Sequence, residues 1–386
     1  MRLFAALRDI AGDRELDVSG DTALEIVEAL TEKFGARFGD IAGAGSVVVN
    51  GERAGLDQRL HEGDEVALLP PVSGGSSEVG LPMKRPERVM LLANPVARTV
   101  SRPLLEVIER ALQSDFKLDV HETNARGHAT ELARDAVAGG FDLVVVFSGD
   151  GTINEALNSL AGTETSLGII PGGATNVMAR WLSIPLDPVE ATLHLLRAAS
   201  EGRRRSLNIG RADGRRFCFA CGVGVDAAAM KHVDARSPKS KRRFEWLSLL
   251  SVVREGMRHA GMPSDLRVRV DGGEPVGAVS VLIGRTHPYT FFKRWGVKVT
   301  PRATMGGGLE VLTVKELKRR SLVPLVYQVL VSGTVADRRN VSYAHDAESV
   351  EITSGAPFPV QLDGDNIGDR TTLSVRLERG ALTVIA

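Results

Sequence analysis

Residues 148–152, Ser-Gly-Asp-Gly-Thr, place a carboxylate between two glycines and a hydroxyl directly after them. Glycines leave the backbone N–H groups of a turn accessible, and such groups at the start of a helix bind phosphate oxygens. The carboxylate can then face a magnesium ion, because hard cations prefer oxygen ligands. The segment is not a P-loop, since no Gly-Lys-Ser or Gly-Lys-Thr follows it. We therefore predict a phosphate-binding turn of another kind.

Strand-like and helix-like segments alternate around this turn and would position it. Strands are predicted at 88–93, 117–122, 143–147 and 166–170, and helices at 103–112, 128–137, 153–160 and 176–182. The run at 143–147 is wholly apolar, which is typical of a parallel strand buried on both faces. Alternation of this kind predicts a parallel sheet with helices on both faces.

Each of these predicted strands ends in a polar or glycine-rich segment. Ligands of parallel sheets bind beyond the carboxyl ends of the strands, so these segments should meet at one rim. Any one of them is a weak signal, because glycine and proline occur in most loops. Their convergence favours a nucleotide site. The segments are Asn94-Pro95; Thr123 with Gly127-His128; Ser148 to Thr152; and Pro171 to Asn176.

Beyond residue 207, short β-rich runs predict antiparallel sheets in a sandwich. One of them, 216–221, contains Cys218 and Cys221, which we interpret as small buried residues because no second pair completes a zinc site. Two helices are predicted. The first, over 239–253, has a basic start and an apolar face that suit either anionic lipid or the core, and the second, over 321–335, is expected to be buried.

Residues 1–75 predict a β-grasp module. Strands are expected at 1–9, 15–18, 46–49 and 65–69, and Asn50-Gly51 favours a tight hairpin. Thr22 and Glu25 have the spacing of a capping box at the start of a helix. Strand, strand, helix and further strands is the order of a ubiquitin-like fold.

Composition is that of a globular protein with two or three domains: 386 residues, 43% hydrophobic and 25% charged. The formal net charge is zero, but residues 1–80 hold seven Lys or Arg against fifteen Asp or Glu, so an acidic module precedes a basic one. The basic part favours an anionic nucleotide or membrane surface, or is a solvated face of mixed charge. No apolar run suits a membrane span and no signal-peptide core begins the chain, so we expect a cytosolic protein.

The end of the first module, Leu69-Pro70-Pro71-Val72-Ser73-Gly74-Gly75, resembles the sulfur-carrying small subunit of molybdopterin synthase. In that family the last glycine carboxylate is converted to a thiocarboxylate. Here Ser76 follows, so the chain as translated cannot carry sulfur. Either a protease cuts after Gly75 and releases a carrier, or the module is a retained docking or regulatory domain. On composition alone, 73–86 is also a flexible linker.

Four ordered motifs in the following region resemble those of the bacterial diacylglycerol kinase-like lipid kinases, a family that includes sphingosine and ceramide kinases. The resemblance runs from about Val89 to the carboxyl terminus and implies transfer of phosphate from ATP to a lipid hydroxyl. The motifs are Asn94-Pro95; Gly127-His128-Ala129; Ser148-Gly149-Asp150-Gly151-Thr152 with Asn154-Glu155; and Pro171-Gly172-Gly173-Ala174-Thr175-Asn176 with Ala179-Arg180.

The same resemblance assigns roles to single residues. Asp363, in an Asp-Gly that by itself is typical of a turn, would be the general base that takes the proton from the lipid hydroxyl. Asp150 would be the second catalytic residue and would contact magnesium bound with ATP. The residues expected to bind the nucleotide are Asn94, Thr123, Gly149, Asp150, Gly151, Thr152, Gly173, Thr175 and Asn176.

Four residues depart from the family pattern. Ser148 stands where the family usually has the first glycine of the loop. Ala174 replaces a threonine, with Thr175 one place later, and Asp365 replaces a glutamate after the candidate base. Gly306 stands where the family usually has an aspartate that helps to hold a structural magnesium. Backbone carbonyls alone hold magnesium poorly, so we do not expect that structural site here.

We therefore expect an α/β plus β fold: a ubiquitin-like β-grasp (1–75), a linker (76–86), a parallel α/β ATP-binding domain (87–206) and an antiparallel β-sandwich that binds lipid and carries the candidate base (207–386). The leading hypothesis is an ATP- and magnesium-dependent lipid kinase acting on diacylglycerol or a related lipid. The alternatives are a sulfur-carrier precursor and a non-catalytic lipid or nucleotide sensor.

The expected partners follow from these hypotheses. They are a lipid substrate, a peripheral membrane surface, and a molybdenum-cofactor sulfur-transfer protein for the first module. We expect no nucleic-acid partner. The sequence leaves open whether the chain forms a homodimer. We expect the protein in the cytoplasm, peripherally at the inner face of the membrane.

Overall fold

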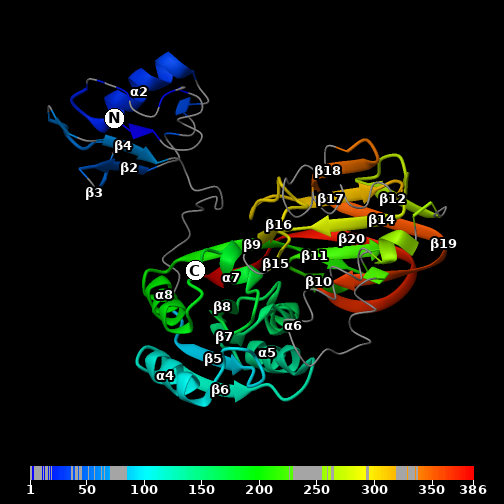
Figure 1. Cartoon of the computed structure of the whole chain (residues 1–386). Coiled ribbons are helices and arrows are strands. Elements are labelled where there is room, and N and C mark those ends of the chain that lie inside the picture. The colour runs from blue at the N-terminus through cyan, green and yellow to red at the C-terminus, as the bar shows by residue number, and fades with distance from the viewer. Residues whose placement is uncertain are drawn as a thin grey trace. The chain divides into compact units, whose positions relative to one another are not determined.

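The computed structural model describes residues 85–225, 265–289, 296–318 and 338–386 in full, the backbone of 290–292 and 295, much of 1–69 and scattered residues of 226–264 and 319–337. The chain forms two compact units, Met1–Ser76 and Ser77–Ala386 (Figure 1). Each unit has a hydrophobic core of its own.

The first unit is a four-stranded sheet with one long helix packed on it. The helix α2 (Ala23–Phe34) buries Ile26, Val27 and Leu30, which recur on one face and join the core of the sheet. The strand order is β1 (Arg2–Leu3), β4 (Val66–Leu69), β2 (Ser46–Val49) and β3 (Glu52–Ala54). The edge strand β1 pairs with β4 in parallel, and the other two pairs are antiparallel.

The local signals predicted for this unit are confirmed. The Thr22 hydroxyl accepts a hydrogen bond from the Glu25 amide, and the Glu25 carboxylate accepts one from the Asp21 amide. Asn50 has the positive φ of 52° that a tight β2–β3 hairpin requires. Most of the strands predicted at 1–9 and 15–18 lie outside the described residues. Within the described part, Arg2–Leu3 is a strand and Leu16 and Val18 are not.

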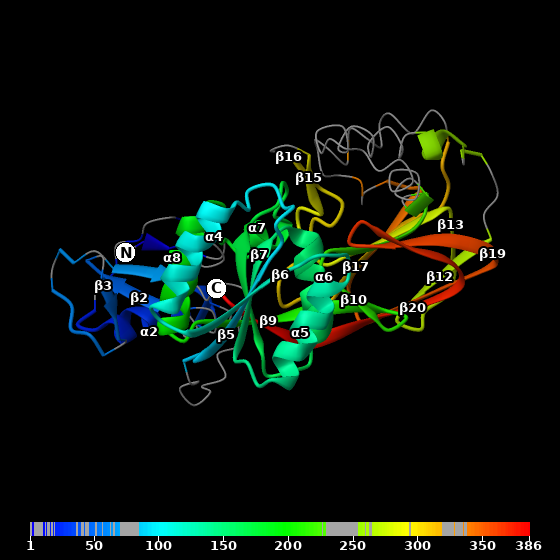
Figure 2. The same cartoon turned by 90° about the horizontal axis from the view of Figure 1, so that it is seen from below.

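Four parallel strands covered by helices open the second unit, as predicted. Figure 2 shows α4 (Arg102–Gln113) and α8 (Pro188–Ser200) on one face of this sheet and α5 (His128–Ala138) and α6 (Asp150–Leu160) on the other. The strand order is β8 (Ser166–Pro171), β7 (Leu143–Ser148), β5 (Arg88–Ala93) and β6 (Lys117–Glu122). The predicted helices are α4 (Arg102–Gln113), α5 (His128–Ala138), α6 (Asp150–Leu160) and α7 (Val177–Trp181).

One further helix, α8 (Pro188–Ser200), was not predicted. Its start is nevertheless encoded locally, because the Asp187 carboxylate accepts hydrogen bonds from the amides of Val189 and Glu190. Pro188 follows as the first helical residue, where its missing N–H costs nothing.

The rest of the second unit is antiparallel and β-rich, which confirms the predicted fold class. Its core is formed by inward-facing residues of these strands. The strands are β9 (Arg204–Ala212), β10 (Arg215–Phe217), β11 (Ala220–Gly224), β12 (Leu266–Val270), β13 (Val276–Ala278), β14 (Ser280–Gly284), β15 (Thr290–Phe292), β16 (Trp295–Val297), β17 (Leu309–Val314), β18 (Val341–Ala347), β19 (Ser349–Leu362) and β20 (Asp365–Ile385).

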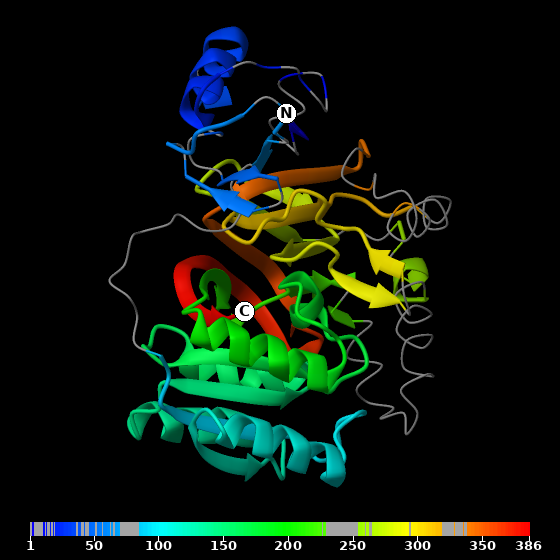
Figure 3. The same cartoon turned by 90° about the vertical axis from the view of Figure 1, so that its left-hand side faces the viewer.

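The last strand connects the two halves of this unit. Along its length β20 pairs with β19 and β9, and at Val384 it pairs in parallel with Leu167 of β8. Figure 3 shows this red strand between the parallel sheet and the β-rich half. Hydrogen-bonded pairing therefore runs without a break from β18 to β6. The predicted boundary at residue 206 falls inside β9.

Some predicted elements differ from the structure. The strand predicted over 216–221 is interrupted, because Cys218 and Phe219 direct their N–H groups to the Asp363 side chain and not to a neighbouring strand. Both cysteines are buried, as expected. Most of the two predicted helices, 239–253 and 321–335, lies outside the described residues.

Candidate active site

Two glycine loops touch at the carboxyl ends of β7 and β8. A Cβ atom on Gly173 would lie 2.6 Å from the Cα atom of Gly149, and a Cβ on Gly149 would lie 3.1 Å from the Cα of Gly173. Distances below 3.0 Å do not occur for real Cβ atoms, so the close approach requires glycine at position 173. The loops predicted to bind phosphate are therefore brought together by backbone contact.

Asp150 lies at the start of α6 and joins the two loops. Its carboxylate oxygens accept hydrogen bonds from the amides of Val177 (3.0 Å) and Met178 (3.2 Å) at the start of α7. Burial raises the pKa of Asp150, and these amide hydrogen bonds oppose the rise. The observed role of this carboxylate is thus to hold α7, which the sequence did not predict.

Thr152 is linked to the neighbouring strand end. Its hydroxyl oxygen accepts hydrogen bonds from the Asn94 side-chain amide (3.2 Å) and from the Ser148 hydroxyl (2.8 Å). Asn94 in turn accepts a hydrogen bond from the Val96 amide at the beginning of its own loop. The first loop and the Gly-Asp-Gly-Thr turn therefore form one connected rim, as predicted.

The remaining predicted nucleotide residues lie on the same loops. Thr123 is buried directly after β6, and its amide donates to the Ala93 carbonyl of β5. Asn176 has a positive φ of 49°, and its side chain both accepts from Gly173 N–H and donates to Gly173 C=O. Thr175 is half-buried in the same turn and accepts a hydrogen bond on its backbone oxygen from Arg180.

Asp363 occupies the two-residue turn between β19 and β20. With φ of 49° at Asp363 and 89° at Gly364, this is the hairpin geometry that Asp-Gly favours. The turn aims the carboxylate at three consecutive amides, those of Cys218, Phe219 and Ala220, each at 2.8 Å. Asp363 is therefore both a turn residue and a carboxylate held in a fixed position.

The surroundings of Asp363 tune its basicity. Desolvation raises its pKa to about 6, and the hydrogen bonds from the three amides and from Asn154 oppose that rise. The group is consequently charged at neutral pH and has a pKa suited to accepting a proton there.

Asn154 connects the two halves of the site. It lies two residues after the Gly-Asp-Gly-Thr segment on α6 and donates a hydrogen bond to the Asp363 carboxylate. The negative charges of Asp363 and Asp150 both raise the pKa of Cys218, although burial of that thiol is the larger cause. Asp150 and Asp363, which are far apart in sequence, are therefore both close enough to Cys218 to affect its pKa.

A charged cluster lies beside the hairpin. Asp365 pairs with Arg126, from the loop between β6 and α5 (2.7 Å), and with Arg215 of β10 (2.9 Å). The pair with Arg126 joins the nucleotide half to the β-rich half, whereas the pair with Arg215 lies within the β-rich half. Neither arginine was predicted, although Arg126 immediately precedes the Gly127-His128 motif.

Sequence reasoning also missed the amides of Cys218, Phe219 and Ala220, which it placed in a strand. Asn154 belonged to a quoted motif but had no assigned role. Its position five residues after Gly149, on the buried face of α6, was the available signal.

The described residues contain no group of three or more His, Cys, Asp or Glu side chains that could hold a metal ion. Magnesium that arrives with ATP needs only one or two protein carboxylates, since phosphate oxygens and water supply the other ligands. Asp150 is the carboxylate placed for that limited role, because it lies at the start of α6 between the two glycine loops. The structural magnesium of the resembled family does not fit, because side chains already bond the carbonyls around Gly306.

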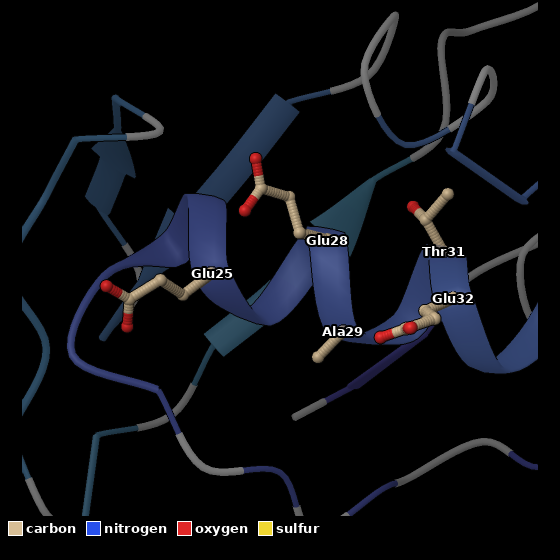
Figure 4. Close-up of a pocket in the computed structure, with 5 residues that line it drawn as sticks. All are labelled: Glu25, Glu28, Ala29, Thr31 and Glu32. Carbon is tan, nitrogen blue, oxygen red and sulfur yellow. The ribbon is translucent and has the colours of Figure 1, made fainter.

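The first unit carries a separate acidic hollow on α2, lined by Glu25, Glu28, Ala29, Thr31 and Glu32 (Figure 4). The three carboxylates point in different directions and do not converge on one centre. We assign no site to it.

Three protein-family models match the chain. The ThiS family matches residues 1–75, the diacylglycerol kinase catalytic domain matches residues 88–211, and the YegS C-terminal NAD kinase beta sandwich-like domain matches residues 220–386. The matches follow one another in the order that the sequence predicted.

Relatives cover most of the second unit. The chain is 26% identical over 291 residues to a diacylglycerol kinase of Bacillus subtilis (strain 168). This match covers 72% of this chain and 90% of that protein. A diacylglycerol kinase of Staphylococcus aureus (strain JH9) is 24% identical over 305 residues, with 76% and 90% covered. A crystal structure of a diacylglycerol kinase from Bacillus anthracis is 21% identical, with a TM-score of 0.58, and covers 78% of this chain and 97% of that one. That structure supports the fold.

Proposed function

We propose that this chain, which joins a ThiS-family domain to a diacylglycerol kinase catalytic domain and its YegS-type C-terminal domain, transfers the γ-phosphate of ATP to the hydroxyl of a lipid such as diacylglycerol. The observation that carries the proposal is the position of Asp363. A carboxylate with a pKa of about 6 is held by three amides and by Asn154, on the helix that begins at the glycine loops.

The glycine loops would hold the triphosphate. Among the described residues no side chain caps the N-terminus of α6, so the helix start is available to an anion. Gly149, Gly151 and Gly173 let phosphate oxygens approach the backbone, and Thr152 offers a hydroxyl fixed by Asn94 and Ser148. When bound with ATP, magnesium would neutralise phosphate charge, with Asp150 as its protein contact.

Asp363 would act on the acceptor. Phosphoryl transfer requires mainly that the nucleophile be positioned and its proton accepted as the new bond forms. The Asp363 carboxylate has the charge and pKa for that task, and its amide contacts limit its movement. The lipid oxygen attacks the γ-phosphate, the bond between that phosphate and ADP breaks, and the lipid proton passes to Asp363.

The acceptor would be reached at a membrane surface. The formal charge of +8 on the chain beyond residue 80 would favour anionic headgroups. No helix in the described part of the chain is long and apolar enough to cross a bilayer.

The test is transfer of labelled phosphate from ATP to a panel of diacylglycerol, sphingosine, ceramide and polyprenol in mixed micelles. Wild type should label at least one acceptor, and Asp363→Asn and Asp150→Asn should each lose most of that activity. Labelling that persists in both variants would refute the site. ATP binding without any labelling would instead indicate a non-catalytic sensor.

A second function for the first unit is favoured by one observation: the ThiS match ends at Gly75, and this part is a separate compact unit. Release of a carrier ending at Gly75 would free the glycine carboxylate for sulfur transfer to a molybdenum-cofactor enzyme. Mass spectrometry of protein from the native host would find that fragment. Intact chain alone would count against it.

A further inference from the structure

Arg285, directly after β14, places a guanidinium where no solvent reaches it. The side chain is 0% exposed. Its Nη2 atom donates to the carbonyl oxygens of Met305 (3.1 Å) and Asn208 (3.2 Å), and its Nη1 atom donates to Gly307 (2.8 Å) and Gly308. A buried cation is costly unless its donors are satisfied, and here backbone oxygens satisfy them.

Asn208 also bonds to the carbonyls of this turn. Its side-chain amide donates to the carbonyls of Gly306 (2.9 Å) and Gly307 (3.1 Å), while its oxygen accepts from the Gly380 amide. Each of the four consecutive carbonyls from Met305 to Gly308 therefore accepts a hydrogen bond from Arg285 or Asn208. These oxygens are the ligands that a cation at this turn would need.

Arg285 keeps its charge despite its burial. Burial lowers its pKa to about 10, and the nearby side chains of Cys218, Glu310 and Asp346 oppose that fall. The guanidinium is therefore charged at neutral pH. Asp346 also accepts a hydrogen bond from the Gly308 amide, so the turn is held from both its carbonyl and its amide side.

The backbone of Arg285 leads to the candidate base. Its amide donates to the Phe219 carbonyl (2.8 Å), and the Phe219 amide donates to Asp363 (2.8 Å). The Asp363 amide donates back to the Ala220 carbonyl (2.8 Å). A short chain of hydrogen bonds thus joins the Met305–Gly308 turn to the carboxylate.

We propose that Arg285 is a positioning residue whose guanidinium takes the place of a divalent ion in the Met305–Gly308 turn and whose backbone holds the Cys218–Ala220 amides against Asp363. The turn is then organised without metal, and Gly306 is tolerated because no carboxylate ligand is required there. The positioning of Asp363 as a base rests on the proposed function, whereas replacement of the metal does not.

The metal part is tested on wild-type protein without nucleotide. After EDTA treatment and desalting we expect no bound divalent ion by elemental analysis. The Tm should be the same in EDTA, Mg²⁺ and Ca²⁺. A stoichiometric ion that survives desalting, or a Tm that falls in EDTA and recovers with Mg²⁺, would overturn the proposal.

The positioning part is tested with Arg285→Met and Arg285→Lys, with the exposed Arg267→Met as control. Loss of the buried donors should lower the Tm by about 3–10 °C in Arg285→Met. The Tm of Arg285→Lys should fall less than that of Arg285→Met, because the ammonium keeps the positive charge. It should still fall, because the ammonium cannot reach all the carbonyls. Arg267→Met should match wild type.

Hydrogen exchange measured by mass spectrometry reads the link to Asp363 without an activity assay. In Arg285→Lys, which serves even if Arg285→Met does not fold, the peptide containing residues 218–220 should exchange faster than in wild type, while β7 should not change. In kinase assays kcat should fall with an unchanged KM for ATP. Wild-type exchange in residues 218–220 would refute the positioning role, whatever the kinase assay gives.

Discussion

Replacing Asn154 by alanine removes one of four hydrogen bonds to the Asp363 carboxylate and leaves the three amide contacts in place. The Asn154 hydrogen bond favours the charged form and lowers the pKa of Asp363. Its loss must therefore raise that pKa. Because the proposed base works when it is deprotonated, the activity should move to higher pH.

The size of the pKa shift can be worked out because the acceptor of the lost hydrogen bond is charged. A hydrogen bond to a charged group contributes about 1.5–3 kcal/mol, and about 1.4 kcal/mol corresponds to one pKa unit. The pKa of Asp363 should thus move from about 6 to between about 7 and 8. At pH 7 this lowers the deprotonated fraction, and with it kcat/KM, by about 2–10-fold, while at pH 9 most activity should return.

The assay is kcat/KM for ATP from pH 5 to 9, with diacylglycerol or the acceptor found in the panel. Asn158→Ala is the matched control, because Asn158 lies one turn further along α6 and contacts Asn154 and Arg216 but is not bonded to Asp363. Its acid limb should stay near pH 6. An unchanged acid limb in Asn154→Ala would refute the reasoning.

Three further predictions concern the loops and the first unit. Gly173→Ala would place a Cβ 2.6 Å from Gly149 Cα, so overpacking of about 1–3 kcal/mol should weaken ATP binding in calorimetry about tenfold, whereas Gly306→Ala, with open space around its Cβ, should bind like wild type. Asp150→Ala removes the acceptor for two α7 amides and should lower the free energy of unfolding by about 1–3 kcal/mol in urea titrations; a neutral result would contradict the observed role. Thr22→Ala should destabilise the β-grasp unit of the full chain by about 0.5–2 kcal/mol, followed by hydrogen exchange in α2, with lipid phosphorylation unchanged. Loss of phosphorylation in that variant would show that the first unit takes part in catalysis.

The parallel half of the fold could be predicted because its signals are local. The apolar run of β7, the glycine turn and the amphipathic α6 follow one another within twenty residues. The spacing of apolar residues distinguishes the strand from the helix. The Asn50-Gly51 hairpin and the Thr22 cap are of the same kind. Their structure depends on neighbouring residues, so one sequence is enough.

The contacts that complete the candidate site depend on distant residues. Cys218 and Phe219 read as strand, but the Asp363 carboxylate, more than 140 positions later, takes their amides. The pairing of β20 with both β9 and β8 likewise follows from the sheet and not from any local pattern. The burial of Arg285 also depends on distant residues, because its guanidinium bonds to carbonyls of Met305 and Gly307.

The central claim is that Asp363 accepts the lipid proton during transfer from ATP. Its most direct test is Asp363→Asn, since asparagine tolerates the left-handed backbone of the hairpin, measured for both ATP binding and labelled-phosphate transfer at pH 7.5. We predict unchanged ATP affinity and a loss of transfer of about 100-fold or more. Transfer at the wild-type rate, with ATP still bound, would contradict the account.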